Sequence, residues 1–399
     1  MEFPFEKIGH AEWRAQVDKE LKGKPYEDFL VWRSIEGFDM ESWQDQLPEM
    51  VPTLINSKEP WKAIEYINEQ NATEANSKAL ASLMAGAEGV WFEKSFRGAA
   101  AEVAMKSIDQ SYAPVFIKHE TLLDFFGPTL KDGTQPVSAD GDTLLLRGER
   151  LRERGATVIQ EVALMLSQGI EALANIKSPS NILFSTGLGS SYLTELSKIR
   201  AFRWLWSSAL MAEGHDAVNP EMIATNLTNE YSKTDEYTNV LRATSAGLAG
   251  AIGGATYIMI KPWDHHFSES SDFSSRITRN IQNLMKDEGR MDKNLNPSDG
   301  SFFIENLTSK IAELAWSEVQ RIEKLGGFSS YVKSKQLLTD LDASRNEKLE
   351  AFTNSESILL GANKYPPVRP EDEPLIKGSE YQYLPDVVSL SYSLSKEEA

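Results

Sequence analysis

Histidines have the widest chemical range in this chain, because a neutral imidazole can bind a metal or move a proton. The chain has five, and two of them, His265 and His266, follow Asp264 directly. Adjacent residues of an extended chain point to opposite sides, so one metal ion seldom reaches both. A packing or solvated role is the favoured interpretation. The sequence contains no cysteine, which excludes disulfides, thiolate metal sites and cysteine nucleophiles.

A second candidate is the glycine-rich turn 187–191, which follows an apolar run and precedes a helical pattern. The amides at such a helix N-terminus can hold an anion. The motif is short, and a tight strand-to-helix turn without a ligand is the favoured interpretation. The sequence has no P-loop, dinucleotide-binding, zinc-protease or nucleophile-elbow motif.

The charge of the chain restricts its partners. Over 399 residues the formal net charge is −18, and the sequence pI is about 4.9. Nucleic acid is therefore not expected, because phosphate binding needs a basic surface. An anionic ligand such as coenzyme A would need a local basic pocket. The apolar runs are too short for a membrane span, and residues 1–6 do not resemble a signal peptide. We expect a cytoplasmic protein without membrane contact.

Two periodic patterns alternate along most of the chain and predict the elements that position these residues. Short β-type runs occupy residues 63–67, 89–92, 114–117, 143–147, 182–186, 222–226 and 255–260. Helical patterns occupy residues 156–175, 193–210, 272–287 and 307–325. This alternation predicts an α/β protein with a mainly parallel sheet covered by helices. Seven such runs favour a (β/α) barrel over an open sheet.

Residues 1–60 read as a separate arm. Trp13, Val17 and Leu21 recur every four residues, which predicts one face of a short helix ending at Gly23. A strand over 29–32 and an aromatic-rich hairpin over 35–43 follow. The segment is too small for its own core, so it packs on the main body or on another protein, and both alternatives stay open. We expect the barrel at 61–330, and a C-terminal helix and linker-like tail at 331–399.

Five strings, in order, resemble the substrate-domain barrel of the methylmalonyl-CoA mutase family. They are similar to the family's G-Y-H-x-x-E-A-G-A segment, its E-x-A-K-L-R-A-A-R-x-L-W helix, a segment that ends in a glycine pair, D-F-S-x-R-I-A-R-N-T-Q, and D-P-x-x-G-S-x-x-V-E. In this chain they occupy residues 148–157, 195–206, 237–255, 272–282 and 296–305. Residues 13–37 look like the arm that opens the family's small subunits.

The resemblance implies an eight-stranded TIM-type barrel. In catalytic members, coenzyme A lies along the barrel axis, and a separate domain brings adenosylcobalamin to the mouth. The reaction is the radical isomerisation of methylmalonyl-CoA and succinyl-CoA. The cofactor supplies the radical, and the protein positions and shields it.

The sequence departs from this pattern at the site itself. Where the family has a Tyr-His pair at the end of the fifth strand, this chain has Glu149 and Arg150. The family's histidine binds the migrating thioester carbonyl, whereas Arg150 is larger and permanently charged. Glu149 would repel a carboxylate substrate. We therefore expect no catalytic residue here, and the favoured interpretation is a salt-bridging strand end at the surface.

Three further departures from the family's pattern also predict a chain without catalytic activity. Only 25 residues separate Ile117 from Thr143, which is short for the family's fourth-strand region, so one strand is either missing or remodelled. The coenzyme-embracing segment before the first strand is reduced to residues 59–61. No cobalamin domain is expected in the chain, and adenosylcobalamin would reach the holoenzyme through the large subunit.

We therefore predict a small subunit of methylmalonyl-CoA mutase that is catalytically silent and stabilises a heterodimer with the large subunit. One alternative is an active mutase half that uses a separately encoded cobalamin domain. Another is a regulatory protein that binds acyl-CoA without converting it. For that function Asn226 and Thr228, placed like the family's R-T-H-S-Q-T segment, are the candidate substrate-binding residues. The competing interpretation is that they cap a strand end.

Overall fold

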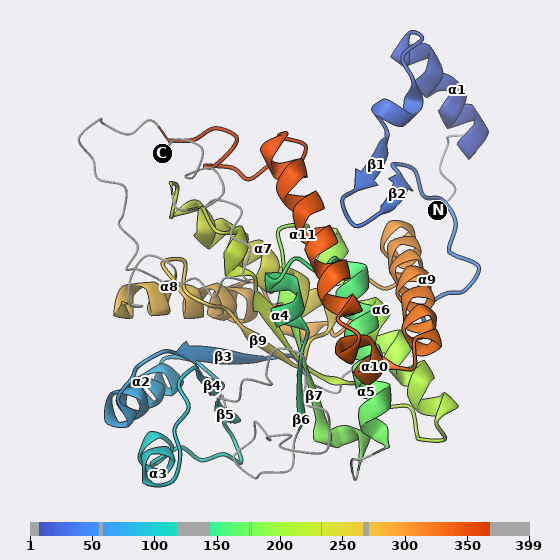
Figure 1. The fold of residues 1–399 in the computed structure, drawn as a ribbon. Helices are drawn as coiled ribbons and strands as arrows, with labels where there is room; N and C mark the ends of the chain where they lie inside the picture. Colours follow the sequence, from blue (N-terminus) through green and yellow to red (C-terminus); the bar gives the residue numbers. More distant parts are fainter. Residues whose placement is uncertain are drawn as a thin grey trace.

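A parallel sheet of seven strands forms the centre of the protein (Figure 1). The computed structural model describes residues 8–55, 59–117, 144–265 and 271–367, apart from residues 175, 177 and 233. The strands are β3 (Lys62–Ile67), β4 (Gly89–Phe92), β5 (Val115–Ile117), β6 (Leu144–Arg147), β7 (Ile182–Leu188), β8 (Glu221–Asn226) and β9 (Tyr257–Met259). All seven β-type runs predicted from the sequence are confirmed.

The order of the strands curls this sheet. Neighbours run β5-β4-β3-β9-β8-β7-β6, so the first strand β3 lies hydrogen-bonded between β4 and the last strand β9. The described edges are β5 and β6. Residues 118–143 connect them, and the strand expected to be missing or remodelled falls in this segment, outside the described residues. The chain is an α/β protein with the architecture of a TIM-type barrel, as predicted.

Helices surround the sheet (Figure 1). They are α2 (Ala72–Met84), α3 (Ala99–Ala104), α4 (Gly148–Glu153), α5 (Val158–Leu173), α6 (Tyr192–Ala212), α7 (Thr238–Gly253), α8 (Asp272–Asn283), α9 (Phe302–Lys324), α10 (Phe328–Lys333) and α11 (Gln336–Thr353). The four helices predicted for the barrel are α5, α6, α8 with its π-helical extension Leu284–Glu288, and α9. Of the helices in the described ranges, none combines the length and apolar composition that crossing a bilayer requires.

Local sequence explains why α5 begins where it does. Thr157 is its N-cap, and its side chain accepts the N–H of Gln160 at 3.1 Å. In return, the Gln160 side chain accepts the N–H of Thr157 at 2.9 Å. This reciprocal capping box satisfies two amides that a helix start otherwise leaves unpaired. It fixes the point at which the chain leaves α4 at the sheet edge and enters the outer helix layer.

Side chains alternate between the two faces of the curled sheet. On the outer face of β7, Phe184 meets Phe202 and Trp206 of α6, with ring centroids 4.7 and 4.9 Å away. The preceding residue, Leu183, points to the inner face and belongs to a separate apolar cluster. This period of two is the pattern expected of barrel strands, which bury both faces.

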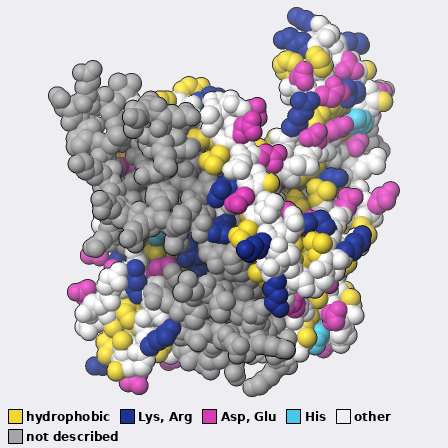
Figure 2. Space-filling model, viewed as in Figure 1, with side chains coloured by type: hydrophobic (Ala, Val, Ile, Leu, Met, Phe, Trp, Pro, Cys, Tyr) yellow, Lys and Arg dark blue, Asp and Glu magenta, His cyan; other side chains and the backbone are white. Residues whose placement is uncertain are grey.

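The hairpin and the helix of the N-terminal arm differ in how much of each is buried. Its hairpin, β1 (Val31–Ser34) and β2 (Phe38–Glu41), reaches the main body, where Phe38 and Met40 are buried in the core shared with the outer helices. The helix α1 (His10–Leu21) has no buried residue and stands away from the barrel (Figure 1). Figure 2 shows acidic, basic and hydrophobic side chains together on this projecting part. Packing on the main body is therefore confirmed for the hairpin, and the connection that follows it also contacts the barrel helices through the carbonyls of Gln46 and Ile55.

Candidate functional site: the mouth of the barrel

Glu149 and Arg150 lie at the carboxyl end of the sheet, where TIM-type barrels carry their sites. β6 ends at Arg147, and Glu149 and Arg150 form the first turn of α4. The Nε of Arg147 donates to Oε1 of Glu149 at 2.5 Å. The Glu149 residue is only 1% exposed. The expected ion pairing at this strand end is present, but it is buried and does not lie at the surface.

Arg150 belongs to a chain of ion pairs across this end of the barrel. Its guanidinium lies 2.8 Å from Glu153 and 3.8 Å from Glu93, which follows β4. Glu153 also pairs at 3.2 Å with Lys261, which follows β9. We call Glu93, Arg147, Glu149, Arg150, Glu153 and Lys261 the mouth network.

The mouth network favours the charged forms of Glu153 and Arg150. Burial alone would raise the pKa of Glu153, but Lys261 and then Arg150 outweigh it and hold that pKa well below its usual range. The attraction of Glu153 raises the pKa of Arg150 above its already high value. Both groups stay charged and mutually paired across the physiological range, which suits structure better than proton transfer.

The concave face below the mouth network is filled with side chains. Each of the seven strands contributes at least one apolar residue to this cluster, which we call the inner plug. Its members are Ile64, Tyr66, Trp91, Phe116, Leu183, Ile223 and Met259, with Leu145 and Tyr257 partly buried beside them. Three of the rings form a continuous contact, because Phe116 lies 6.1 Å from Trp91 and 5.3 Å from Tyr257 between ring centroids. The described strands thus enclose a packed core.

Of the histidines that the structure describes, His265 lies at this end of the barrel. His265 follows β9 and packs against Tyr66 of β3, with ring centroids 5.4 Å apart at 74°. His266, its neighbour in sequence, lies outside the described residues. Within the described part of the chain, no group of three or more His, Cys, Asp or Glu side chains is arranged to hold a metal ion.

Asn226 and Thr228 lie where β8 ends. The side-chain oxygen of Asn226 accepts the N–H of Lys261 at 2.7 Å, and its amide nitrogen donates to the Tyr231 hydroxyl. Its amide therefore joins the ends of β8 and β9. Thr228 begins a short 3-10 turn and is 3% exposed. Binding of an acyl-CoA by these two residues stays a prediction.

The glycine-rich turn 187–191 does hold anions, but they belong to the chain. The N–H of Gly187 donates to Glu161 and the N–H of Ser190 to Glu230, both at 2.8 Å. Glu161 is fully buried and pairs with Lys198 at 2.8 Å. Internal carboxylates occupy two of the turn's amides, which agrees with a turn that serves the fold.

Sequence reasoning missed Glu93, Glu153 and Lys261. The three come from segments far apart in the chain, and no local spacing connects them. One signal was available, because Glu93 and Lys261 directly follow predicted strands, and the carboxyl ends of parallel strands meet at one edge. Glu153 lies within the string 148–157 that carries the family resemblance.

Comparison with known proteins gives consistent matches. Residues 138–383, more than half of the chain, match the family described as Methylmalonyl-CoA mutase. The chain is 27% identical to the methylmalonyl-CoA mutase small subunit of Porphyromonas gingivalis, over 91% of this chain and 70% of that protein. It is 27% identical to the large subunit from the same organism, over 59% of this chain and 34% of that protein. Against the Escherichia coli mutase it is 29% identical, but the match covers only 33% of that protein.

Proposed function

Because the chain belongs to the methylmalonyl-CoA mutase family, we propose that it is a small subunit of an adenosylcobalamin-dependent mutase, that it is catalytically silent, and that it stabilises a heterodimer with the large subunit. Relatives from Porphyromonas gingivalis and Streptomyces virginiae that are named as small subunits support this assignment. Relatives named as large subunits support the existence of such a partner. The cytoplasm is the compartment that we propose.

The inner plug is the observation that carries the proposal of catalytic silence. In catalytic members, as the resemblance implies, coenzyme A lies along the barrel axis, which requires an open bore. Here Trp91 is 1% exposed and Phe116 5% exposed, and both project from the strands into that space. The described residues therefore do not fit coenzyme A on the axis, and we derive no catalytic step through it or through cobalamin.

The mouth network supports the same proposal. The family's histidine can give a hydrogen bond to a thioester carbonyl and remain neutral. Arg150 instead directs its guanidinium to Glu153 and Glu93. A substrate group that approached Arg150 would compete with these carboxylates, and displacing Glu153 would leave a buried charge without one of its partners. Glu149, buried beside it, adds a negative charge where a carboxylate substrate would approach.

For each of the two alternative functions, one observation in the structure is favourable. The contact of Tyr66 with His265 places a tyrosine and a histidine together at the mouth, and an active mutase half could use them. Asn226 and Thr228 lie at the same end of the sheet and are the candidates for a non-catalytic acyl-CoA regulator. The inner plug argues against both, because each requires space for the pantetheine chain.

Co-expression with the large subunit tests the proposal. We expect the two chains to co-elute on size exclusion as a heterodimer that converts methylmalonyl-CoA with adenosylcobalamin. The separated chain, mixed with a free cobalamin domain, should give no succinyl-CoA and should bind no acyl-CoA in calorimetry.

Other results would each contradict one part of it. Turnover by the separated chain that disappears in His265→Asn would establish the active half. Acyl-CoA binding that disappears in Asn226→Ala would establish the regulator. If the large subunit elutes alone, the heterodimer is wrong.

A further inference from the structure

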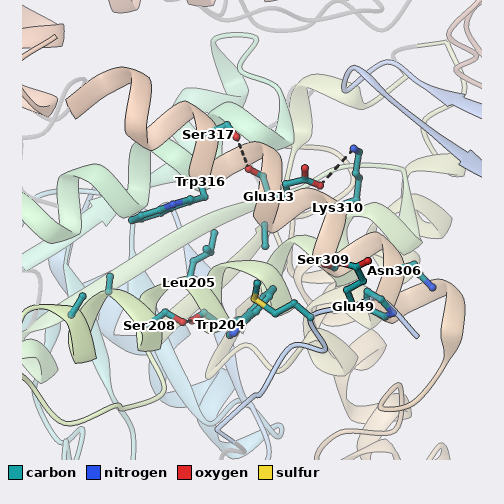
Figure 3. Close-up of a pocket in the computed structure, with 15 residues that line it drawn as sticks. Glu49, Trp204, Leu205, Ser208, Asn306, Ser309, Lys310, Glu313, Trp316 and Ser317 are labelled. Carbon is teal, nitrogen blue, oxygen red and sulfur yellow. Dashed lines mark hydrogen bonds and ion pairs between the residues drawn. The ribbon is translucent and has the colours of Figure 1, made fainter. Parts of the chain in front are cut away.

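A groove of about 810 Å³ lies on the outer surface over the line where α6 packs against α9 (Figure 3). Its floor is apolar, with Trp204 and Leu205 from α6 and Trp316 from α9. Met50, from the connection between the arm and the barrel, closes one side. In Figure 3, Leu205 and Trp316 face each other across the space between the two helices.

Trp316 on α9 lies outside the main packing face of its helix. The opposite face of α9 packs on the outer helices, and Ile311, Ala315 and Val319 there are almost fully buried. Trp316 lies off that face and is 42% exposed. A solvent-facing position on a helix is normally polar. A tryptophan at such a position, with further apolar side chains beside it, marks a surface that another molecule covers.

The groove continues into the arm. The connection from the hairpin to the barrel exposes Leu47, Met50 and Val51, three apolar side chains within five residues. The side-chain nitrogen of Asn306, on α9, fixes this connection by donating to the carbonyl of Gln46 at 2.7 Å. Any partner that covers the exposed arm is thereby brought to the open end of the groove.

We propose that this groove binds an amphipathic helix of the large subunit, an inference that rests on the heterodimer proposed above. The lining residues of α9 extend from Asn306 to Ser317. At 1.5 Å per residue this is about three helical turns, which accepts apolar side chains spaced at i, i+4 and i+7.

The charged side chains at the rim of the groove indicate which charges the partner helix carries. Lys310 and Glu313 form an exposed ion pair at 3.7 Å, and Glu49 lies on the same rim. An apolar centre within a charged rim is the usual anatomy of a specific interface. With two acidic side chains and one basic side chain, this rim favours a helix flanked by Lys or Arg.

Two groove variants and two controls test the assignment in the assembled heterodimer. Leu205→Glu and Trp316→Glu should each raise the dissociation constant for the large subunit by about 30-fold or more, as loss of a central anchor does. Met84→Glu, at a 91% exposed position on α2, should leave it within about twofold. Trp316→Phe should retain most of the affinity. Urea unfolding of each separated variant verifies that the chain still folds.

Photo-crosslinking identifies the occupant without relying on a destabilising change. A benzophenone side chain replacing Lys310 should form an adduct with the large subunit. Adducts with a second copy of this chain, or with residues 1–7 of the same chain, would overturn the inference. So would Glu variants that bind as the wild type does, and in that case the heterodimer itself stands. If the wild-type chain fails to bind the large subunit, both proposals are wrong.

Discussion

At the scale of single residues, the mouth network matches three carboxylates with three cations. Removing one member of a buried ion pair leaves the other charged without compensation, and this costs more than the pair contributes. Groups held in this way are poorly suited to bind a substrate that comes and goes. The network therefore resembles the ionic core of a structural barrel more than a reaction site.

Glu153 provides a test at this scale. Glu153→Gln should lower the free energy of unfolding at pH 7 by about 3 kcal/mol, because Lys261 and Arg150 lose a buried counter-charge. The folded-state pKa of Glu153 lies below its usual range, so its contribution is complete above the unfolded pKa and is lost as pH falls toward the folded one. Urea unfolding from pH 7 to pH 3 should show the difference between wild type and variant shrinking below about pH 4.

The matched control is Glu102→Gln at an exposed position on α3. Its effect should stay within about 0.5 kcal/mol at every pH. Equal effects at the two positions would mean that the mouth network adds nothing to stability.

At the scale of elements, one carboxylate joins the arm to the barrel. Glu36, in the turn of the β1–β2 hairpin, pairs with Arg152 of α4 at 3.2 Å and accepts the N–H of Val158 at the start of α5. Although burial opposes its charge, Lys348 of α11 and Arg152 hold the pKa of Glu36 below its usual value. A negative charge at a helix N-terminus also gains from the helix dipole. Three elements thus converge on one side chain of the arm.

Glu36→Gln should release the hairpin without unfolding the barrel. We expect a loss of about 3 kcal/mol in unfolding free energy, since Arg152 keeps a buried charge with one partner fewer. Hydrogen exchange at the Val158 amide should accelerate about 10-fold or more. Asp39→Asn, on an exposed position of the same hairpin, should change neither quantity. Unchanged exchange in the Glu36 variant would show that the apolar contacts of Phe38 and Met40 alone hold the hairpin.

The sequence predicts the strands of this fold better than its site. Each run is short, apolar and bounded by turn residues, and these are local properties. The pairing of Glu93 with Arg150 depends instead on the curl of the sheet, which brings together segments nearly 60 residues apart. The inward direction of Trp91 and Phe116 depends on register, and a shift of one residue would reverse it. The docking of Glu36 at α5 is a contact across more than 100 residues, and no periodicity encodes it.

At the scale of the whole molecule, the barrel joins its first and last strands and fills the space between them. β3 pairs with both β4 and β9, and the inner plug takes side chains from all seven strands. If catalytic members hold coenzyme A on the axis, as the resemblance implies, their barrels cannot be packed in this way. Under the proposed function, a chain without catalytic activity can keep its axis packed. The inner plug then stabilises the subunit that the heterodimer contains. The inner plug is thus the feature on which the proposal of a supporting, non-catalytic barrel rests.

Trp91 tests this view, because it is the largest side chain of the inner plug and Arg147 lies 5.6 Å from its ring at the mouth. Trp91→Ala should lower the free energy of unfolding by about 3–5 kcal/mol, the cost of an unfilled cavity in a packed core. Trp32→Ala, at a 38% exposed position of the arm, should cost about 1 kcal/mol or less. The measurements are urea unfolding at pH 7 and calorimetry with coenzyme A. If Trp91→Ala changes stability no more than Trp32→Ala does but alters coenzyme A binding, the axis is a ligand channel and the chain is an active half.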